Sequence, residues 1–157
     1  MKFLLIGGQP DSGKSETIYR IFMRYSISYT QISNLHPHAQ IPSGFPFEDF
    51  SVLLEGLNNK GNLVKILIHS PTDDSYNINM LKNNIISHSP DIIICSIRDI
   101  DWQRQMVLDI VANNYHFEIP LARITRRHNS RPIALDWYRS TIDILIDSVL
   151  VQTPFSL

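Results

Sequence analysis

The stretch MKFLLIGGQPDSGKSETIYRIFMRY, residues 1–25, decides the fold class of this chain. Residues 2–6 form an apolar run that is long enough for one buried strand and too short for a membrane helix. Residues 8–15 then fit the pattern G-x-x-x-x-G-K-[ST]. Apolar residues follow at helical spacing, at Ile18, Ile21, Phe22 and Tyr25. The stretch therefore predicts a strand, a glycine-bearing loop and a helix in direct succession.

The loop contains the residue types that phosphate binding requires. Glycines let the backbone approach a phosphate closely, and the free N–H groups at a helix N-terminus attract an anion. Lys14, which we expect to be exposed without a ligand, supplies a mobile cation for the outer phosphates and is also a catalytic candidate. The Ser15 hydroxyl can coordinate Mg²⁺. We therefore predict a nucleotide-binding set that comprises Gly8, Gln9, Pro10, Asp11, Ser12, Gly13, Lys14, Ser15 and Glu16.

This loop resembles the Walker A element of P-loop NTPases and kinases, and the resemblance covers about the first 25 residues. Asp11 stands where many such loops carry Gly or Ala, although loops similar to that of dethiobiotin synthetase carry Asp at the matching place. Aspartate tolerates a left-handed backbone better than most residues do. The resemblance implies a nucleoside triphosphate as ligand, ATP or else GTP, and Mg²⁺ as cofactor.

The composition indicates one soluble domain that spans residues 1–157. The net charge is −1, so no bulk electrostatic attraction toward nucleic acid or a membrane is visible, and we expect neither as a partner. The single cysteine, Cys95, lies in an apolar run, which excludes an internal disulfide and suits a reducing cytoplasm. The apolar run at the N-terminus is too short to be the core of a signal peptide. We therefore expect a cytoplasmic protein.

Two apolar runs, Phe50–Leu57 and Leu63–His69, are separated by an Asn- and Gly-rich segment that favours an antiparallel hairpin. The second run is followed by Ser-Pro-Thr-Asp-Asp. In P-loop proteins the strand beside the first strand carries a carboxylate for the Mg²⁺ shell, so the resemblance makes Asp73 and Asp74 candidate metal ligands together with Ser15. The same residues also suit the N-cap of a helix. Both interpretations can hold together.

The segment between the first helix and the hairpin predicts a short strand at residues 28–33 and an exposed, proline-rich loop from Leu35 to Phe47. P-loop proteins commonly place a switch or a substrate lid in this position, and long loops are often functional. His36 and His38 lie in the loop, but two histidines without a further ligand make a poor metal site. We therefore interpret the segment as an exposed loop with loop histidines, in which the resemblance implies a switch or a lid.

The second half of the chain alternates helices with strands. It predicts a helix near residues 80–86, a fully buried strand at 91–97, a helix at 101–113 and an edge strand at 117–124 that contains Pro120. A closing helix begins near Pro132, with an inner face made by Trp137, Tyr138, Ile142, Leu145, Ile146 and Val149. The alternation predicts an α/β fold, a three-layer α/β/α sandwich with a mainly parallel sheet and one antiparallel hairpin strand.

Arginines are concentrated in the final third of the chain. Arg98 ends the buried strand at the edge where ligands of α/β sheets gather, so we predict a catalytic role for it. Arg126 and Arg127 follow the last strand, where a guanidinium can stack on a base or meet phosphate charge, so we predict that they bind nucleotide. The competing interpretation is a solvated basic loop.

The leading hypothesis is a small Mg²⁺-dependent protein that binds a nucleoside triphosphate and hydrolyses it slowly. One alternative is a kinase that passes the γ-phosphoryl group to a small acceptor. Another is an interaction module that signals to a protein partner through the loop 35–47. The hairpin next to the central strand is similar to that of Ras-type GTPases, and the Pro-x-Ser-Gly-Lys-Ser loop to that of nucleotide kinases, but P-loop folds host all three functions.

Overall fold

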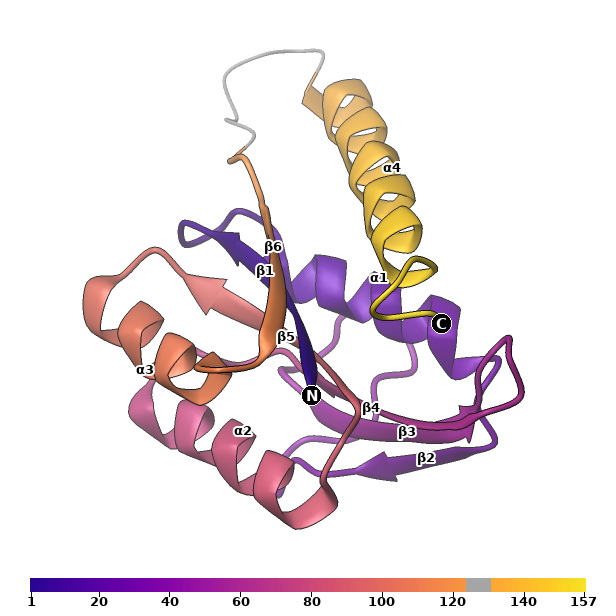
Figure 1. The fold of residues 1–157 in the computed structure, drawn as a ribbon. Coiled ribbons are helices and arrows are strands. Elements are labelled where there is room, and N and C mark those ends of the chain that lie inside the picture. The colour runs from indigo at the N-terminus through magenta and orange to yellow at the C-terminus, as the bar shows by residue number, and fades with distance from the viewer. Residues whose placement is uncertain (124–130) are drawn as a thin grey trace.

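The computed structural model of the chain describes residues 1–123 and 131–157. Six strands form one sheet in the order β2-β3-β4-β5-β1-β6, and the described residues also contain four helices (Figure 1). Strands β4, β5, β1 and β6 run parallel, whereas β3 is antiparallel to both of its neighbours. The prediction of an α/β fold with a mainly parallel sheet is therefore confirmed. The elements are β1 (Lys2–Gly8), α1 (Lys14–Ser26), β2 (Gln31–Asn34), β3 (Ser51–Leu57), β4 (Leu63–His69), α2 (Ser75–His88), β5 (Ile92–Arg98), α3 (Asp101–Val111), β6 (Tyr115–Pro120) and α4 (Arg131–Leu150).

The strand order corrects one expectation from the resemblance. The hairpin β3–β4 does not lie beside β1, because β5 pairs with β1 on one side and with β4 on the other. All residues of β5 from Ile92 to Ile97 are buried, as a strand requires when it has neighbours on both edges and helices on both faces. The residue opposite Gly8 on the neighbouring strand is therefore Arg98, and the end of β4 lies one strand farther away.

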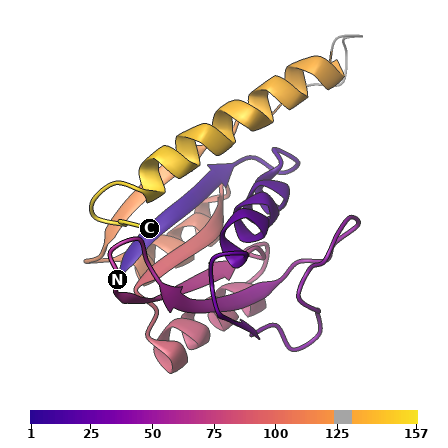
Figure 2. The same cartoon turned by 90° about the vertical axis from the view of Figure 1, so that its right-hand side faces the viewer.

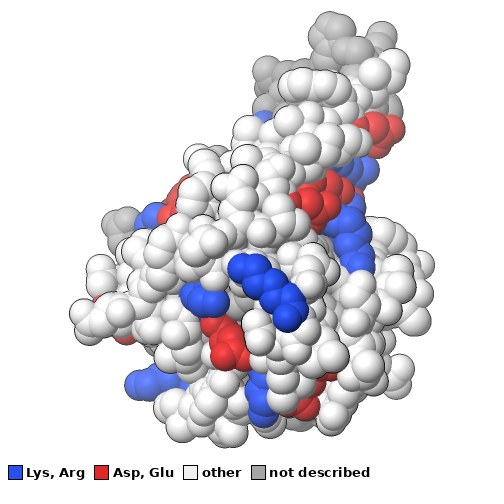
Figure 3. Space-filling view, turned by 45° about the vertical axis from the view of Figure 1, so that its right-hand side comes forward, with Lys and Arg blue, Asp and Glu red and all other residues white. Residues whose placement is uncertain are grey.

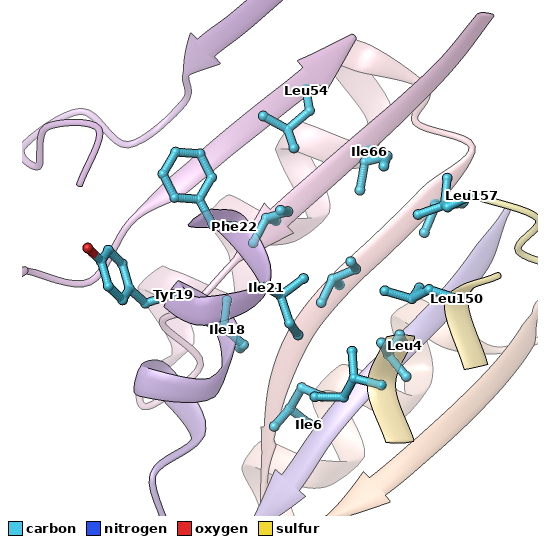
Figure 4. Packing of buried hydrophobic residues seen from close by; sticks show 14 of the residues in the cluster. Leu4, Ile6, Ile18, Tyr19, Ile21, Phe22, Leu54, Ile66, Leu150 and Leu157 are labelled. Atoms are coloured by element: carbon cyan, nitrogen blue, oxygen red, sulfur yellow. The ribbon is translucent and has the colours of Figure 1, made fainter. Parts of the chain in front are cut away.

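The helices divide between the two faces of the sheet. Helices α1 and α4 cover one face, and α2 and α3 cover the other (Figures 1 and 2). Side chains of a strand alternate between faces, so Leu4 and Ile6 of β1 pack with α1 and α4, whereas Phe3 and Leu5 pack with α2 and α3. Figure 4 shows Leu150 of α4 beside Leu4. Two buried apolar layers thus hold β1 rigidly in the middle of the molecule.

The inner face of α4 differs from the prediction. Ile142, Ile146 and Leu150 are buried, but Trp137 is 69% exposed and Leu145 is 42% exposed. Apolar residues occur on most sides of this helix, so its periodicity alone does not select the side that meets the sheet. The prediction that Trp137 and Leu145 face inward is wrong. Strand β6 does lie at the sheet edge, as Pro120 predicted.

His69, at the end of β4, is a fully buried histidine between β3 and α2. Its Nε2 lies 3.2 Å from the Asn77 carbonyl and its Nδ1 lies 3.0 Å from the Ser51 hydroxyl. Because a carbonyl can only accept, Nε2 carries the proton and Nδ1 accepts from Ser51. Burial lowers the pKa of His69 to about 4. The ring is therefore neutral at pH 7.

We expect His69 to reduce the free energy of unfolding by roughly 3 kcal/mol as the pH falls from 7 to 4. Between the unfolded pKa near 6.5 and the folded pKa near 4, the unfolded chain binds more protons, so acidification favours unfolding. Urea denaturation at several pH values checks this against His69→Gln, in which the contribution is absent. Identical pH slopes in the two proteins would contradict the prediction.

Candidate functional site

The loop between β1 and α1 has a positive φ at three residues, with 142° at Gly8, 61° at Asp11 and 88° at Gly13. A Cβ atom added to Gly8 would lie 2.7 Å from the Ser12 hydroxyl oxygen and 2.9 Å from the Leu121 carbonyl oxygen, so this position has no room for a side chain. Gly13 is needed for its φ alone, since nothing lies within 4 Å of an added Cβ. Asp11 adopts the left-handed conformation that aspartate tolerates.

Lys14 is buried rather than exposed, with 8% of the residue accessible. Its Nζ donates hydrogen bonds to the Gly8 carbonyl at 2.8 Å and the Gln9 carbonyl at 2.7 Å, so the side chain curls back and closes its own loop. Burial lowers the pKa of Lys14, and Arg98 lowers it further, while two nearby aspartates act in the opposite direction. The expectation of an exposed lysine is therefore wrong. A buried ammonium needs polar partners, and the loop carbonyls provide them.

A pocket of about 260 Å³ opens beside this loop, and we call it the edge pocket. The sheet brings its walls together, because the parallel strands β1, β4 and β5 all end on this side. Ser12, also in the loop, has a buried hydroxyl oxygen with no hydrogen-bond partner among the described residues. The edge pocket is lined by Pro10, Asp11, Gly13, Lys14, Ser15, Glu16, Asp49, Ser70, Pro71, Thr72, Asp73, Ser96 and Arg98.

The two candidate metal ligands after β4 have different environments. Asp74 is the N-cap of α2, and its carboxylate accepts a hydrogen bond from the Asn77 backbone N–H at 2.7 Å. Asp73 lines the edge pocket together with Ser15. Its carboxylate accepts from the Asn77 side-chain amide at 3.2 Å and lies 3.7 Å from the Arg98 guanidinium. Asp73 and Ser15 thus line the same pocket, whereas Asp74 caps the N-terminus of α2.

Asp49 is a pocket residue that the sequence analysis missed. It directly precedes Phe50 and β3, and because β3 is antiparallel, its first residue lies at the edge where β4 and β5 end. The Ser70 hydroxyl donates to the Asp49 carboxylate at 2.9 Å and accepts from the Phe50 N–H at 2.9 Å. The signal that could have identified Asp49 is the predicted hairpin, because its first strand must start at the edge of the sheet where its second strand ends.

Hydroxyl groups form the floor between the ends of β4 and β5. The Ser96 hydroxyl donates to the Ser70 carbonyl at 2.7 Å and lies 2.5 Å from the Thr72 hydroxyl. Because the Ser96 proton is used on the carbonyl, Thr72 donates to Ser96. All three residues are buried. Their mutual bonds fix the backbone that carries Asp73.

Of the predicted arginines, Arg98 lies at the pocket, and 28% of its side chain is exposed. Arg126 and Arg127 lie outside the described residues. Arg123 reaches Asp11 of the loop, but the two groups are 4.0 Å apart and both well exposed, so the contact contributes little. The structure therefore places one of the three predicted arginines at the candidate site.

Glu16 lines the edge pocket and also forms ion pairs that connect α1 to α4. It accepts from Arg139 of α4 at 2.7 Å and from Arg20 at 3.2 Å. Arg20 also contacts Asp143 of α4 at 3.0 Å, and Arg24 extends the series. Figure 3 shows acidic and basic groups next to each other along one side of the protruding part of the molecule. The first turn of α1 is thus held to α4 by a series of ion pairs.

The predicted switch or lid lies between β2 and β3. Phe47 stacks on Tyr19 of α1 with ring centroids 4.5 Å apart, and Phe45 meets the same ring edge-on at 4.9 Å. Phe45 itself remains 67% exposed. The loop is therefore attached to the helix that follows the phosphate-binding pattern, and two residues later the chain reaches Asp49 in the edge pocket.

Comparison with known proteins gives no family for this chain: no protein-family model, curated protein or solved structure matches it. Among the described residues, no helix is long and apolar enough to cross a membrane. The same residues include no group of three or more His, Cys, Asp or Glu side chains that could hold a metal ion by themselves.

Proposed function

We propose that this chain is a P-loop protein of the three-layer α/β/α type that binds a nucleoside triphosphate, ATP or GTP, in the edge pocket. The observation that carries the proposal is the position of Lys14. Its ammonium group is buried, beside a polar pocket, and its partners are two neutral carbonyls. A desolvated cation gains most from an anionic partner, and a polyphosphate at the start of α1 provides one.

Mg²⁺ fits the same pocket as part of a nucleotide complex. This ion keeps several waters and is usually held by one or two protein groups together with substrate phosphates. Ser15 and Asp73 supply such groups, and Asp49 offers a second carboxylate in the lining of the same pocket. When bound, the ion would neutralise charge on the outer phosphates.

The activity we propose is slow hydrolysis of the γ-phosphate, with Arg98 as the group that faces the developing charge. One observation also favours a switch function. Asp49 lies two residues beyond the loop 35–47 and lines the edge pocket, so a ligand in the pocket changes the surroundings of the segment that connects the loop to β3. A kinase activity has no comparable support among the described residues.

Titration calorimetry with ATP and GTP, each with and without Mg²⁺, tests this function. We expect binding to tighten when Mg²⁺ is present, and phosphate release to depend on Mg²⁺ as well. If neither ATP nor GTP binds at millimolar concentration, the proposal is contradicted. Nucleotide binding without phosphate release would agree with the switch function and would contradict the proposed hydrolysis.

Asp73→Asn and Asp74→Ala form a matched pair of variants for the metal. We expect Asp73→Asn to weaken the Mg²⁺-dependent part of nucleotide binding at least about tenfold, because it removes a charge from the metal shell. Asp74→Ala should leave that binding unchanged and destabilise the fold by about 1 kcal/mol through loss of the α2 cap. Calorimetry and thermal denaturation measure the two effects. If Mg²⁺ tightens nucleotide binding to Asp73→Asn as much as to the unchanged chain, Asp73 is not a ligand of the metal ion.

A further inference from the structure

The outer face of α4, continued by Val151 just beyond its last residue, carries a regular seam of exposed residues. Six exposed residues recur at steps of three and four, which is the spacing of a coiled-coil seam. The largest of them are strongly exposed, with 69% for Trp137, 68% for Ile144 and 56% for Val151. Figure 2 shows α4 along the outside of the molecule, and the buried side of the helix is the opposite one. We call this set the outer seam: Ala134, Trp137, Thr141, Ile144, Ser148 and Val151.

The order of residues in the outer seam is self-complementary. Small and large side chains alternate strictly along it, in the order Ala, Trp, Thr, Ile, Ser, Val. A second copy of the helix can be placed antiparallel about a two-fold axis midway between residues 142 and 143. Every large residue then lies opposite a small one, so that Trp137 meets Ser148, Ile144 meets Thr141 and Val151 meets Ala134. A two-fold contact needs this kind of matching between a surface and itself.

The polar groups of the outer seam have partners within the helix. The Thr141 hydroxyl donates to the Trp137 carbonyl at 2.9 Å, and the Ser148 hydroxyl donates to the Ile144 carbonyl at 2.7 Å. Burial of a hydroxyl costs free energy mainly when it loses its hydrogen bond, and these bonds persist in a dimer. The small positions therefore leave space for a large neighbour without leaving a proton donor unsatisfied.

The flanks of the outer seam carry almost no charge. Ile133, Ser140, Leu145 and Gln152 border it, and the acidic residue beside them, Asp147, is paired with Arg24 of its own chain at 3.1 Å. Two copies thus meet without repulsion between like charges, whereas a strongly charged partner would find little to pair with along these flanks. In Figure 3 most charged groups on the coloured part of this protrusion lie along one of its sides.

We propose that a second copy of this chain docks on the outer seam, forming a dimer with antiparallel α4 helices. From residue 134 to residue 151 the seam is about 26 Å long at 1.5 Å per residue. A single pair of helices of this length lies at the small end of specific interfaces, so the dimer dissociates at roughly 1–100 µM. This association is independent of nucleotide, and the proposed function does not depend on it.

Sedimentation equilibrium of the full chain, from about 1 to 300 µM to span the expected dissociation constant, tests the dimer. We expect a reversible monomer–dimer equilibrium that Trp137→Asp weakens at least about 30-fold, because each dimer loses its two largest seam side chains and buries two aspartates in their place. Trp102→Asp is the matched control: this tryptophan is 51% exposed on α3, away from the outer seam, and should change the dissociation constant less than about threefold. Monomers at every concentration, or equal effects of the two variants, would overturn the proposal.

Disulfide trapping tests the antiparallel register. The native Cys95 is fully buried, so introduced cysteines are the accessible thiols among the described residues. A mixture of Thr141→Cys and Ile144→Cys chains, exposed to a mild oxidant, should give mainly the mixed dimer, since these two positions face one another. Thr141→Cys alone should crosslink poorly. Efficient crosslinking of Thr141→Cys alone would indicate parallel helices and overturn the proposed arrangement.

Discussion

Replacement of Lys14 by alanine is expected to weaken the binding of MgATP and MgGTP by a factor between about 10 and 150. The structure holds the Lys14 ammonium in a buried position at the loop, hydrogen-bonded to the carbonyls of Gly8 and Gln9. A charge-assisted contact from such a group to phosphate contributes about 1.5–3 kcal/mol, which corresponds to this range in affinity. Titration calorimetry of both nucleotides measures the loss directly.

Two further variants separate the charge of Lys14 from its packing. Lys14→Met keeps a long buried side chain and removes the ammonium, so it should lose as much affinity as Lys14→Ala. Lys82→Ala removes an exposed lysine of α2 outside the edge pocket and should bind nucleotide like the unchanged chain. Wild-type affinity in both Lys14 variants would refute the phosphate-binding role of the loop.

Replacement of Arg98 by alanine is expected to lower the rate of γ-phosphate hydrolysis about 100-fold, while nucleotide affinity changes less than about threefold. Arg98 ends β5 opposite Gly8, and its partly buried guanidinium is held near Asp73 at 3.7 Å. A cation in this position gains most when negative charge increases on the transferred group. Such an interaction is stronger in the transition state than in the bound nucleotide, so its loss affects turnover more than binding.

Single-turnover phosphate release and calorimetry on the same Arg98→Ala preparation measure the two quantities separately. Arg104→Ala serves as the matched control, because Arg104 bonds Glu118 at 2.6 Å, outside the edge pocket, and joins α3 to β6. This control should lose some stability and retain its rate per folded molecule. If Arg98→Ala loses affinity and turnover in equal proportion, Arg98 binds the ground state and has no special role in the transition state.

The sequence predicted well those features that depend on residues close together in the chain. The strand, loop and helix at residues 1–25, the β3–β4 hairpin and the buried strand β5 all follow from local patterns of apolar residues, glycines and turn residues. The left-handed backbone at Asp11 also agrees with its residue type. Element bounds shifted by a few residues, as with β2 at Gln31–Asn34 and β6 at Tyr115–Pro120, because pairing with a neighbour sets where a strand begins and ends.

The candidate site was predictable only in part. Six of the nine predicted loop residues line the edge pocket together with Asp73, and Gly8, Gln9 and Ser12 are not among its lining residues. Asp74 caps a helix with the same type of side chain. The two aspartates are adjacent in the chain, and only the direction in which α2 leaves the sheet decides between them. Asp49 had no local motif at all, because it reaches the pocket through the antiparallel pairing of β3.

By itself, the sequence determined the class of fold, the order of the elements and the position of the glycine-bearing loop between β1 and α1, because each depends on short-range propensity and periodicity. Only the tertiary structure decided that β5 lies between β1 and β4, that Lys14 is buried, and that Trp137 of α4 faces outward. These outcomes depend on which distant segments meet. Several arrangements satisfy the same local pattern, and burial of apolar side chains between the sheet and its helices, which joins segments distant in the chain, selects among them.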